Sequence, residues 1–476
     1  MQLARKILFF IFILIYLVLC PLVILYSFGY ILNPDKKGVS QTGVIYLSSI
    51  PSGADVYLEK SRFKHKTPTS IRALNPGKYS VTVKLNGYRR WSQKVNIKAG
   101  KAVTFDNILL LPKKNIPQDI SSGEDYSDLV PCKGANYFIL KKSSRLKDFY
   151  IYDQKNQEVE PIIQGKNGYE DFAVNSIYNQ KQSRIFIAFG GVLWDKKYFL
   201  IDTKDKNQAL IEITDLFPKH PDSILWRGKN KENIFALYDN YVNRLNAENL
   251  SFYPKYIDQI KGFGISKKEL YILREDNTIL KSKLNKKGEN IVFKDKYLGR
   301  DLFKRSPFYR IRQLENDIFL FQGDRGDLIT TVPPYHLVKK NLSDFNYNQL
   351  KKKLLFWTKD TIKVADFSVK GKKKLFKDQV QLFKPYSQGS NITQCFWVYQ
   401  GTHLLFKDKD DVFLLRADPK RKYRKQHLVQ VKRNTKVFYS EDTGFLYYIN
   451  QEDQAMKIRI VPNKSFFRNF TEENDN

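Results

Sequence analysis

The chain has 476 residues, of which 81 are Lys or Arg and 49 are Asp or Glu, so its formal net charge is +32. Its composition, 42% hydrophobic with a mean hydropathy of -0.47, suits soluble globular domains. The length exceeds what one hydrophobic core ordinarily organises, which predicts two or more domains. Phe and Tyr are abundant, with 34 and 29 residues, and this favours strands. The expected fold class is therefore mainly β.

The positive charge has two interpretations. It can attract an anionic partner, such as a cell-wall polymer, lipid head groups or nucleic acid, or it can reflect lysines spread over a solvated surface. The charge is not concentrated, because residues 44–112 carry +9, residues 1–43 carry +3 and residues 113–476 carry the remaining +20. A nucleic-acid-binding domain would show a denser basic stripe or a known module, so no nucleic acid partner is expected.

One long apolar segment, Ile7 to Leu32, stands near the N-terminus and contains no charged residue. As a helix it would be about 39 Å long, enough to cross a hydrocarbon core of about 30 Å with some tilt. Arg5 and Lys6 precede it, and cations before an apolar run favour an N-terminus on the cytoplasmic side. We therefore expect a cytoplasmic tail (1–6), a transmembrane signal-anchor helix (7–32) and an extracytoplasmic bulk in a single-pass protein of the cell membrane.

A cleaved signal peptide is the alternative interpretation of this segment. Such peptides have an apolar region of about 7–15 residues and a small-residue cleavage site, whereas this run is longer and no A-x-A-like triplet closes it. Lipidation of Cys20 would need a small residue before the cysteine, and Leu19 stands there. We interpret the run as an uncleaved membrane anchor.

Turn and strand patterns dominate residues 44–112, which follow a short polar linker at 33–43. Pro51-Ser52-Gly53, Thr67-Pro68 and Asn75-Pro76-Gly77 are turn sequences. The stretch Lys78 to Leu85 alternates apolar and polar residues, which predicts a half-buried strand. Asn86-Gly87 follows it, a pair that is favoured in tight hairpins.

The order PSGADVYL, KTPTSI and LNPGKYSVTVKLNGYRRWSQKVNIKAG resembles the PEGA domain. Ser52 stands where the Pro-Glu-Gly-Ala pattern of that family has its Glu. The resemblance covers residues 44–112 and implies a small β-sandwich of the kind found on exported, often membrane-anchored, surface proteins of bacteria and archaea. It implies a binding or scaffolding role in the envelope and no catalytic residue.

Arg89, Arg90 and Trp91 are the candidate ligand contact of this domain. Guanidinium groups and an indole ring can hold an anion or a sugar by charge and by stacking. The alternative is that the aromatic residues Tyr79, Tyr88 and Trp91 pack in the core or across strands.

A linker at 113–128 leads to a region with an internal rhythm at 129–465, which a tail at 466–476 follows. Short apolar runs, each followed by a polar turn, recur along this region. They begin at Tyr137, Ile185, Ile234, Leu270, Ile318, Leu354, His403 and Phe445, at intervals of 36 to 49 residues. Four-stranded propeller blades repeat at about 40–50 residues. A seven- or eight-bladed β-propeller is therefore expected, with tandem β-sandwiches as the alternative.

No catalytic or metal-binding motif stands out in the sequence. The five histidines, which are His65, His220, His336, His403 and His427, form neither an HExxH motif nor an i, i+4 pair, and no GxSxG or GxxxxGK[ST] sequence occurs. Cys132 and Cys395 could pair in an oxidising compartment or stay two separate buried thiols. We expect no cofactor, no metal and no enzymatic activity.

These observations predict a membrane-anchored envelope protein of a prokaryote, whose exported PEGA-like and propeller-like domains bind or scaffold at the cell surface. The expected partners are the membrane, through Ile7–Leu32, and an anionic cell-wall polymer or envelope proteins. Two alternatives remain open: an exported propeller hydrolase or lyase, and a subunit of a membrane-associated assembly or sensor.

Overall fold

The computed structural model describes residues 2–27, 30–33, 38–113, 116–120, 123–132, 137–142, 149–163, 175–179, 184–189, 197–202, 210–226, 233–246, 249–266, 269–283, 289–293, 303–315, 318–330, 336–339, 341–367, 381–399, 401–417 and 425–460. It divides into two compact units, one made of Met1–Ile116 with Arg459–Asn476 and the other of Pro117–Ile458. Strand residues outnumber helical residues in both units, so the prediction of a mainly β fold is confirmed.

The apolar segment near the N-terminus forms the helix α1, Gln2–Ser27, which contains Pro21. The side chains from Ile7 to Leu19 are all large and apolar, and each is at least 39% exposed. Within the part of the chain whose side chains are described, no helix is both long and apolar enough to span a membrane. The transmembrane span expected at 7–32 stays a prediction.

A two-stranded hairpin follows α1, where the sequence suggested the end of the helix and a linker. It pairs β1 (Tyr30–Asn33) with β2 (Gly38–Gln41) in antiparallel register. Because the chain is extended and paired from Tyr30 onward, the helix ends before Leu32.

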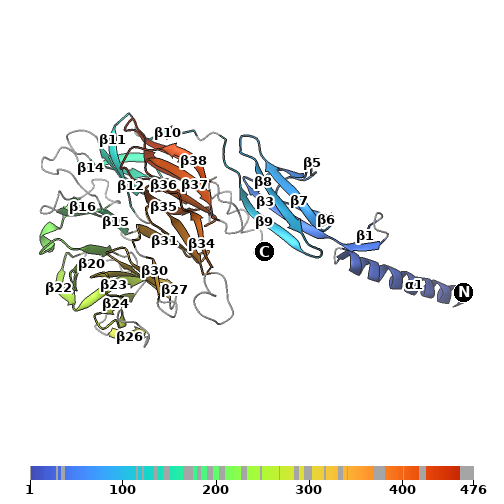
Figure 1. Ribbon diagram of the computed structural model, residues 1–476, viewed down its shortest axis with the longest axis horizontal. Coiled ribbons are helices and arrows are strands. Elements are labelled where there is room, and N and C mark those ends of the chain that lie inside the picture. The colour runs from blue at the N-terminus through green and yellow to red at the C-terminus, as the bar shows by residue number, and fades with distance from the viewer. Residues whose placement is uncertain are drawn as a thin grey trace. The chain divides into compact units, whose positions relative to one another are not determined.

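The next residues form a β-sandwich of two sheets, most of whose strands carry a label in Figure 1. One sheet has the order β6–β3–β9, with β3 (Gly43–Ile50), β6 (Thr69–Leu74) and β9 (Ala102–Leu109). The other has the order β5–β4–β7–β8, with β4 (Asp55–Leu58), β5 (Ser61–Arg62), β7 (Gly77–Lys84) and β8 (Trp91–Ile97). Val56, Val81 and Val83 of the second sheet share a core with Ile45 and Leu47 of the first, and all five are fully buried.

Two of the turn sequences in this sandwich bind each other. The N–H group of Gly53 donates to the carbonyl oxygen of Thr67 (2.7 Å), and the N–H group of Thr67 donates to that of Ala54 (2.9 Å). The hydroxyl oxygen of Thr67 accepts a third bond, from the N–H group of Ala54 (3.0 Å). Gly53 has a φ of +77°, a conformation that glycine adopts at little cost. These residues therefore shape the fold.

The second unit contains, among its described residues, eight successive groups of four strands, which we number as blades 1 to 8. Blade 1 comprises β11 (Tyr126–Pro131), β12 (Tyr137–Lys142), β13 (Phe149–Asp153) and β14 (Glu158–Ile163); blade 2 comprises β15 (Asn175–Asn179), β16 (Arg184–Phe189), β17 (Lys197–Asp202) and β18 (Leu210–Glu212). Blade 3 comprises β19 (Ser223–Trp226), β20 (Asn233–Tyr238), β21 (Tyr241–Asn246) and β22 (Phe252–Ile257), and the short 3-10 helix η2 (Thr214–Leu216) precedes it.

The remaining blades follow the same plan. Blade 4 comprises β23 (Ile260–Ser266), β24 (Glu269–Arg274), β25 (Ile279–Lys283) and β26 (Glu289–Phe293); blade 5 comprises β27 (Tyr309–Glu315), β28 (Ile318–Gly323), β29 (Leu328–Thr330) and β30 (His336–Lys339). Blade 6 comprises β31 (Asp344–Asn348), β32 (Lys353–Trp357), β33 (Ile362–Asp366) and β34 (Gln381–Tyr386); blade 7 comprises β35 (Ile392–Val398), β36 (His403–Asp408), β37 (Asp411–Arg416) and β38 (Lys425–Gln430). Blade 8 comprises β39 (Phe438–Tyr439), β40 (Phe445–Ile449), β41 (Ala455–Arg459) and β10 (Gln118–Asp119).

Each of the eight apolar runs in the sequence forms the second strand of a blade. These strands are β12, β16, β20, β24, β28, β32, β36 and β40. The second strand has a hydrogen-bonded strand on either side in every blade, including blades 4 and 5, which β23 and β27 join into one eight-stranded sheet. Neighbouring blades cover its two faces. A strand buried on both faces has a continuous apolar sequence instead of an alternating one, which explains why these runs repeat.

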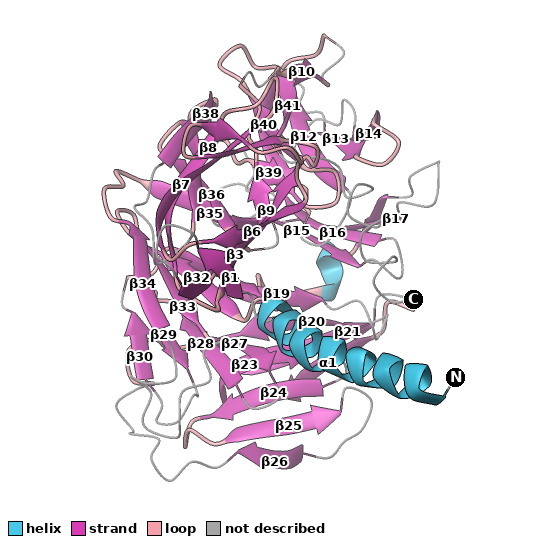
Figure 2. Ribbon diagram, turned by 90° about the vertical axis from the view of Figure 1, so that its right-hand side faces the viewer, coloured by secondary structure: helices cyan, strands magenta, loops and turns pink. Residues whose placement is uncertain are grey.

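The hydrophobic clusters lie between successive blades and join them. Clusters span blades 2 and 3, 3 and 4, 4 and 5, 5 and 6, 6 and 7, and 8 and 1. Blades 1 and 2 touch through β11 and β15, and blades 7 and 8 through the side-chain amide of Gln394, which exchanges two hydrogen bonds with Val437 (2.8 and 3.1 Å). The blades thus follow one another around a closed ring, as Figure 2 shows, which is the arrangement of a β-propeller.

The ring closes because a strand from the start of the unit pairs with a strand from its end. β10 pairs with β41 in the register Gln118↔Lys457 and Asp119↔Met456, so a segment that precedes blade 1 completes blade 8. The N–H group of Ile120 then donates to the carbonyl oxygen of Ala455 (2.9 Å). This closing segment lies within 113–128, where the sequence suggested a linker.

Ile120→Ala should lower the free energy of unfolding of the propeller by about 2–4 kcal/mol, because it leaves a cavity in a buried cluster. The side chain of Ile120 is 9% exposed and packs with Tyr126, Phe138 and Tyr447 between blades 8 and 1. The control is Ile116→Ala, since Ile116 is 75% exposed. Denaturant unfolding of both variants measures the difference, and equal stabilities would contradict the role of this segment in ring closure.

Candidate binding surfaces

The candidate contact Arg89–Trp91 lies at the start of β8, after a connection of six residues from β7. The Asn86-Gly87 pair does not form a two-residue hairpin. Gly87, with a φ of +78°, begins a segment that pairs with the end of the sandwich: the N–H group of Arg89 donates to the carbonyl oxygen of Leu111 (2.7 Å). The connection between β7 and β8 is longer than a two-residue turn because part of it pairs with Leu111.

The structure separates the two kinds of side chain in this candidate contact. Arg89 and Arg90 are exposed. Trp91 is partly buried and packs against the core of the sandwich, where its ring meets Phe105 edge to face with centroids 5.2 Å apart. The indole ring thus serves packing first, and only the two guanidinium groups face solvent. Ligand binding by these residues stays a prediction.

Positive charge covers the sandwich far beyond these two arginines. All twelve Lys and Arg residues of 44–112 are exposed: Lys60, Arg62, Lys64, Lys66, Arg72, Lys78, Lys84, Arg89, Arg90, Lys94, Lys98 and Lys101. Three acidic residues, Asp55, Glu59 and Asp106, accompany them. Arg62 forms an ion pair with Asp55 (2.7 Å). A surface with this charge attracts anionic partners.

In the propeller, charged groups with shifted pKa values gather near one end of the ring. We call it the connection end, because it carries the connections between blades and the turns between second and third strands. Partial loss of hydration raises the pKa of Asp128 on β11 and of Asp324, an exposed residue of the β28–β29 turn. It lowers the pKa of Lys261 on β23, of Lys407 on β36 and of Arg312, which is exposed on β27. Such groups occur at functional sites and at structural interfaces alike. The contacts of each group therefore show which of these two roles it has.

Lys407 and Asp128 belong to the seam where blades 7, 8 and 1 meet. The ammonium group of Lys407, 3% exposed, donates to the carbonyl oxygen of Thr435. Asp128 attracts this cation, and its carboxylate accepts hydrogen bonds from the N–H groups of Leu129 (2.8 Å) and Lys436 (3.4 Å). These two charged groups bind the connection between blades 7 and 8, so their role is structural.

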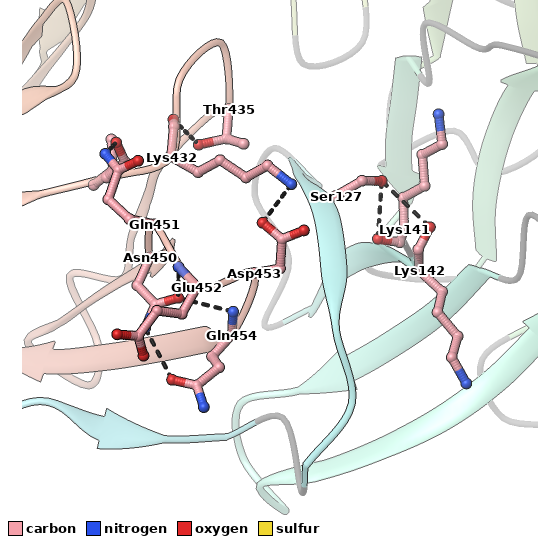
Figure 3. Close-up of polar contacts among 11 residues, drawn as sticks. Ser127, Lys141, Lys142, Lys432, Thr435, Asn450, Gln451, Glu452, Asp453 and Gln454 are labelled. Atoms are coloured by element: carbon pink, nitrogen blue, oxygen red, sulfur yellow. Dashed lines mark hydrogen bonds and ion pairs between the residues drawn. The ribbon is translucent and has the colours of Figure 1, made fainter. Parts of the chain in front are cut away.

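The same seam continues in the turn between β40 and β41, which Figure 3 shows. The ammonium group of Lys432 lies 2.6 Å from the carboxylate of Asp453. The side-chain carbonyl of Asn450 accepts hydrogen bonds from the N–H groups of Glu452 (3.0 Å) and Gln454 (2.8 Å), and the side-chain amide of Gln451 donates to the carbonyl oxygen of Val431 (2.8 Å). Asn450 therefore shapes this turn, and Gln451 and Asp453 hold it against the connection that enters blade 8.

β27, in blade 5, carries two positive groups that lie away from this seam. The guanidinium carbon of Arg312 lies 5.0 Å from the ring centre of Phe345, and the carboxylate of Asp344 opposes the effect of lost hydration on its pKa. Arg310, two residues earlier, is exposed, and its charge counteracts the loss of hydration that raises the pKa of Asp324. This arrangement can attract an anion.

A pocket of about 560 Å³ lies at the connection end of blade 6. It is lined by Asn341–Ser343, before β31, and by Thr358–Thr361, between β32 and β33. The hydroxyl group of Thr358 donates to the carboxylate of Asp360 (2.6 Å). The polar groups that line this pocket can contact a small polar ligand.

The histidines and cysteines lie apart in the described parts of the chain. His427 pairs with Asp411 (2.9 Å), and the ring of His220 lies 3.4 Å from the hydroxyl oxygen of Tyr198. Burial lowers the pKa of His403 to about 3, and the charge of Arg416 adds to this effect. Cys132 and Cys395 are both buried and form no disulfide. The side chain of His336 lies outside the described residues.

No group of three or more His, Cys, Asp or Glu side chains that could hold a metal ion occurs among the described residues. Sequence reasoning missed Asp128, Arg312 and Lys407, because each is a single charge in an ordinary strand. Only the ring brings their partners, from other blades, next to them.

The comparison with protein families finds a match within the sandwich. Residues 42–110 match the PEGA domain family, which confirms that resemblance for this segment. A comparison with curated proteins finds no relative of the chain.

Several solved structures are similar to the larger part of the chain. Saccharomyces cerevisiae Sqt1 is 10% identical, with a TM-score of 0.46 over 73% of this chain and 98% of that one. The β-propeller domain of Cps50 (Swd1) from Myceliophteria thermophila is 9% identical, with a TM-score of 0.41 over 73% and 99%. Kluyveromyces lactis Hsv2 is 13% identical, with a TM-score of 0.41 over 64% and 98%.

Trp91→Ala should lower the free energy of unfolding of the sandwich by about 2–4 kcal/mol, because it removes a large ring that packs on the core. Arg89→Ala/Arg90→Ala should change it by less than about 0.5 kcal/mol, because both side chains are exposed. Denaturant unfolding followed by Trp and Tyr fluorescence compares the two variants. A stable Trp91→Ala form would instead leave the indole available as a ligand contact.

Proposed function

We propose that this protein is held in a membrane by α1 and presents its PEGA domain and its propeller as binding and scaffolding modules in the envelope of a prokaryotic cell. The bulk of the chain would then lie on the extracytoplasmic side, with the N-terminus in the cytoplasm. The proposed partners are the membrane and an anionic wall polymer or envelope proteins.

The observation that carries the proposal is the surface of α1. Its side chains from Ile7 to Leu19 are apolar and exposed on all sides of the helix. An amphipathic helix that packs on a domain or lies on a membrane surface has one polar face. A helix without a polar face needs an apolar environment all around it, and a bilayer interior provides one.

The two β units support a binding role. Their exposed positive charge and the polar pocket of blade 6 suit recognition of anionic or polar groups. The buried charges near the connection end of the propeller are engaged in holding blades together. Resemblance to the PEGA family implies an exported, surface-associated protein, which agrees with a tether at the N-terminus.

Leu14→Lys/Val18→Lys should move the protein from the membrane fraction to the soluble fraction, because each lysine near the middle of a membrane helix costs about 2.5–3.5 kcal/mol. The matched control is Leu350→Lys/Leu382→Lys, which changes two exposed leucines of blade 6. Carbonate extraction of membranes followed by immunoblotting measures the distribution. Retention of the α1 variant in the membrane pellet would contradict anchoring by this helix.

Leu350→Cys should react with a membrane-impermeant maleimide in intact cells as strongly as in lysed cells. Leu350 is 85% exposed, whereas Cys132 and Cys395 are buried, so the new thiol dominates the signal over the parent chain. Reaction only after lysis would place the propeller inside the cell and overturn the proposed orientation.

A further inference from the structure

The outward surface of the four-stranded PEGA sheet carries a regular array of polar side chains. On β7, Val81 and Val83 point into the core, so by strand alternation the residues between and beside them point outward. Cross-strand register adds the outward residues of β8 and β4. We call this surface the outer face. Its residues are Lys78, Ser80, Thr82 and Lys84 on β7, Ser92, Lys94 and Asn96 on β8, Asp55 and Tyr57 on β4, and Arg62 on β5.

The charge of the outer face is positive and largely uncompensated. Of the two carboxylates at this face, Asp55 forms an ion pair with Arg62 (2.7 Å), and Glu59 accepts a hydrogen bond from the N–H group of Ser80 (2.7 Å). Among the described residues, no carboxylate forms an ion pair with Lys78, Lys84 or Lys94, and all three are exposed. Lys78 and Lys84 are six positions apart on one straight strand, which is roughly 20 Å. The face thus offers an extended row of cations.

Hydrogen-bonding groups fill the space between these cations. The hydroxyl groups of Thr82 and Ser92 lie 2.9 Å apart on neighbouring strands. Ser80 is paired with Lys94, and Lys78 with Asn96. The ring of Tyr57 lies beneath the ammonium group of Lys84, 4.4 Å away. A row of hydroxyl and amide groups beside charges can bind a ligand that carries both hydroxyl groups and anions.

The sandwich lacks the side chains that a membrane-surface binder uses. Proteins that bind the surface of a bilayer insert exposed Trp, Phe or Leu between lipids. No large hydrophobic residue of 43–112 is exposed in this fully described stretch. Charge without an apolar wedge favours a soluble polyanion over a lipid surface.

We propose that the outer face binds a linear polyanion rich in hydroxyl groups, such as a polyol phosphate chain, which lies along β7 across Lys78, Lys94 and Lys84. This inference rests on the proposed function and names the partner of the PEGA domain. Phosphate groups suit these lysines because an ammonium group binds phosphate as a point charge, without the planar fork that carboxylate pairing with arginine uses.

The test uses the full chain in a neutral detergent and poly(glycerol phosphate) as the probe. Lys78→Gln/Lys84→Gln/Lys94→Gln should weaken binding by at least about tenfold and flatten its salt dependence. The charge-matched control is Arg72→Gln/Lys98→Gln/Lys101→Gln, which removes three exposed cations from β6 and from the β8–β9 turn. It should change affinity less than about threefold. Equal losses in both variants would overturn the assignment of the outer face.

Two further arms test the chemistry of the ligand. Thr82→Val/Ser92→Ala keeps every charge and should weaken binding of poly(glycerol phosphate) but not of polyglutamate, which lacks hydroxyl groups. Equal binding of both polymers by the parent chain would overturn the hydroxyl part of the proposal. Mixed micelles that contain phosphatidylglycerol could compete with the polymer for the protein. If they compete more strongly than free polymer does, the proposed polymer ligand is wrong and a lipid surface is the ligand.

The outcomes also separate this inference from the proposed function. Failure of the parent chain to bind either polymer would contradict an anionic envelope polymer as partner. Binding that survives in the outer-face variant would contradict only the location of the site. Membrane extraction of the outer-face variant should match that of the parent chain, and loss of the variant from membranes would show that its effect does not come from the ligand.

Discussion

The pairing of β10 with β41 is the contact on which the larger unit depends. Each blade buries its faces only against its neighbours, so an open row of blades would leave two large apolar surfaces in water. The pairing Gln118↔Lys457 and Asp119↔Met456 ties the first residues of the unit to the last. The aromatic cluster of Phe138, Tyr152 and Tyr447 then fills the closing interface. Lys407, Asp128 and Asp453 bind the connection that enters blade 8, at Thr435, Lys436 and Lys432.

Charge has different roles in the two units. Near the connection end of the propeller, several buried ions meet backbone carbonyl groups, N–H groups and opposite charges, so much of their electrostatic energy holds blades in place. In the sandwich the cations lie on the surface around a mainly apolar core, and among the described residues of that domain Arg62 is the one cation that forms an ion pair with a carboxylate, that of Asp55. Cations without such partners keep their attraction for an external anion, which explains why the binding proposal centres on the smaller unit.

The motif residues of the PEGA segment illustrate how a recognisable pattern arises from fold requirements. Thr67 uses its N–H, carbonyl and hydroxyl groups to satisfy Gly53 and Ala54, and it does so while Ala54 is fully buried. A buried turn must satisfy its backbone groups internally, so the two turns are needed together. The surface between these motifs is free to vary, and there the chain carries lysines and hydroxyl groups.

The sequence by itself determined the mainly β class, the PEGA-like segment and the repeat of the propeller. It could do so because a strand covered on both faces must be continuously apolar, and the eight runs starting at Tyr137 through Phe445 each became the second strand of a blade. Only the tertiary structure decided that β10 comes from a presumed linker, that Trp91 packs on Phe105, and that Asp128 and Lys407 meet at one seam. Those outcomes depend on contacts between residues up to about 340 positions apart in sequence. The local sequence pattern of one strand does not indicate which distant residue it will contact.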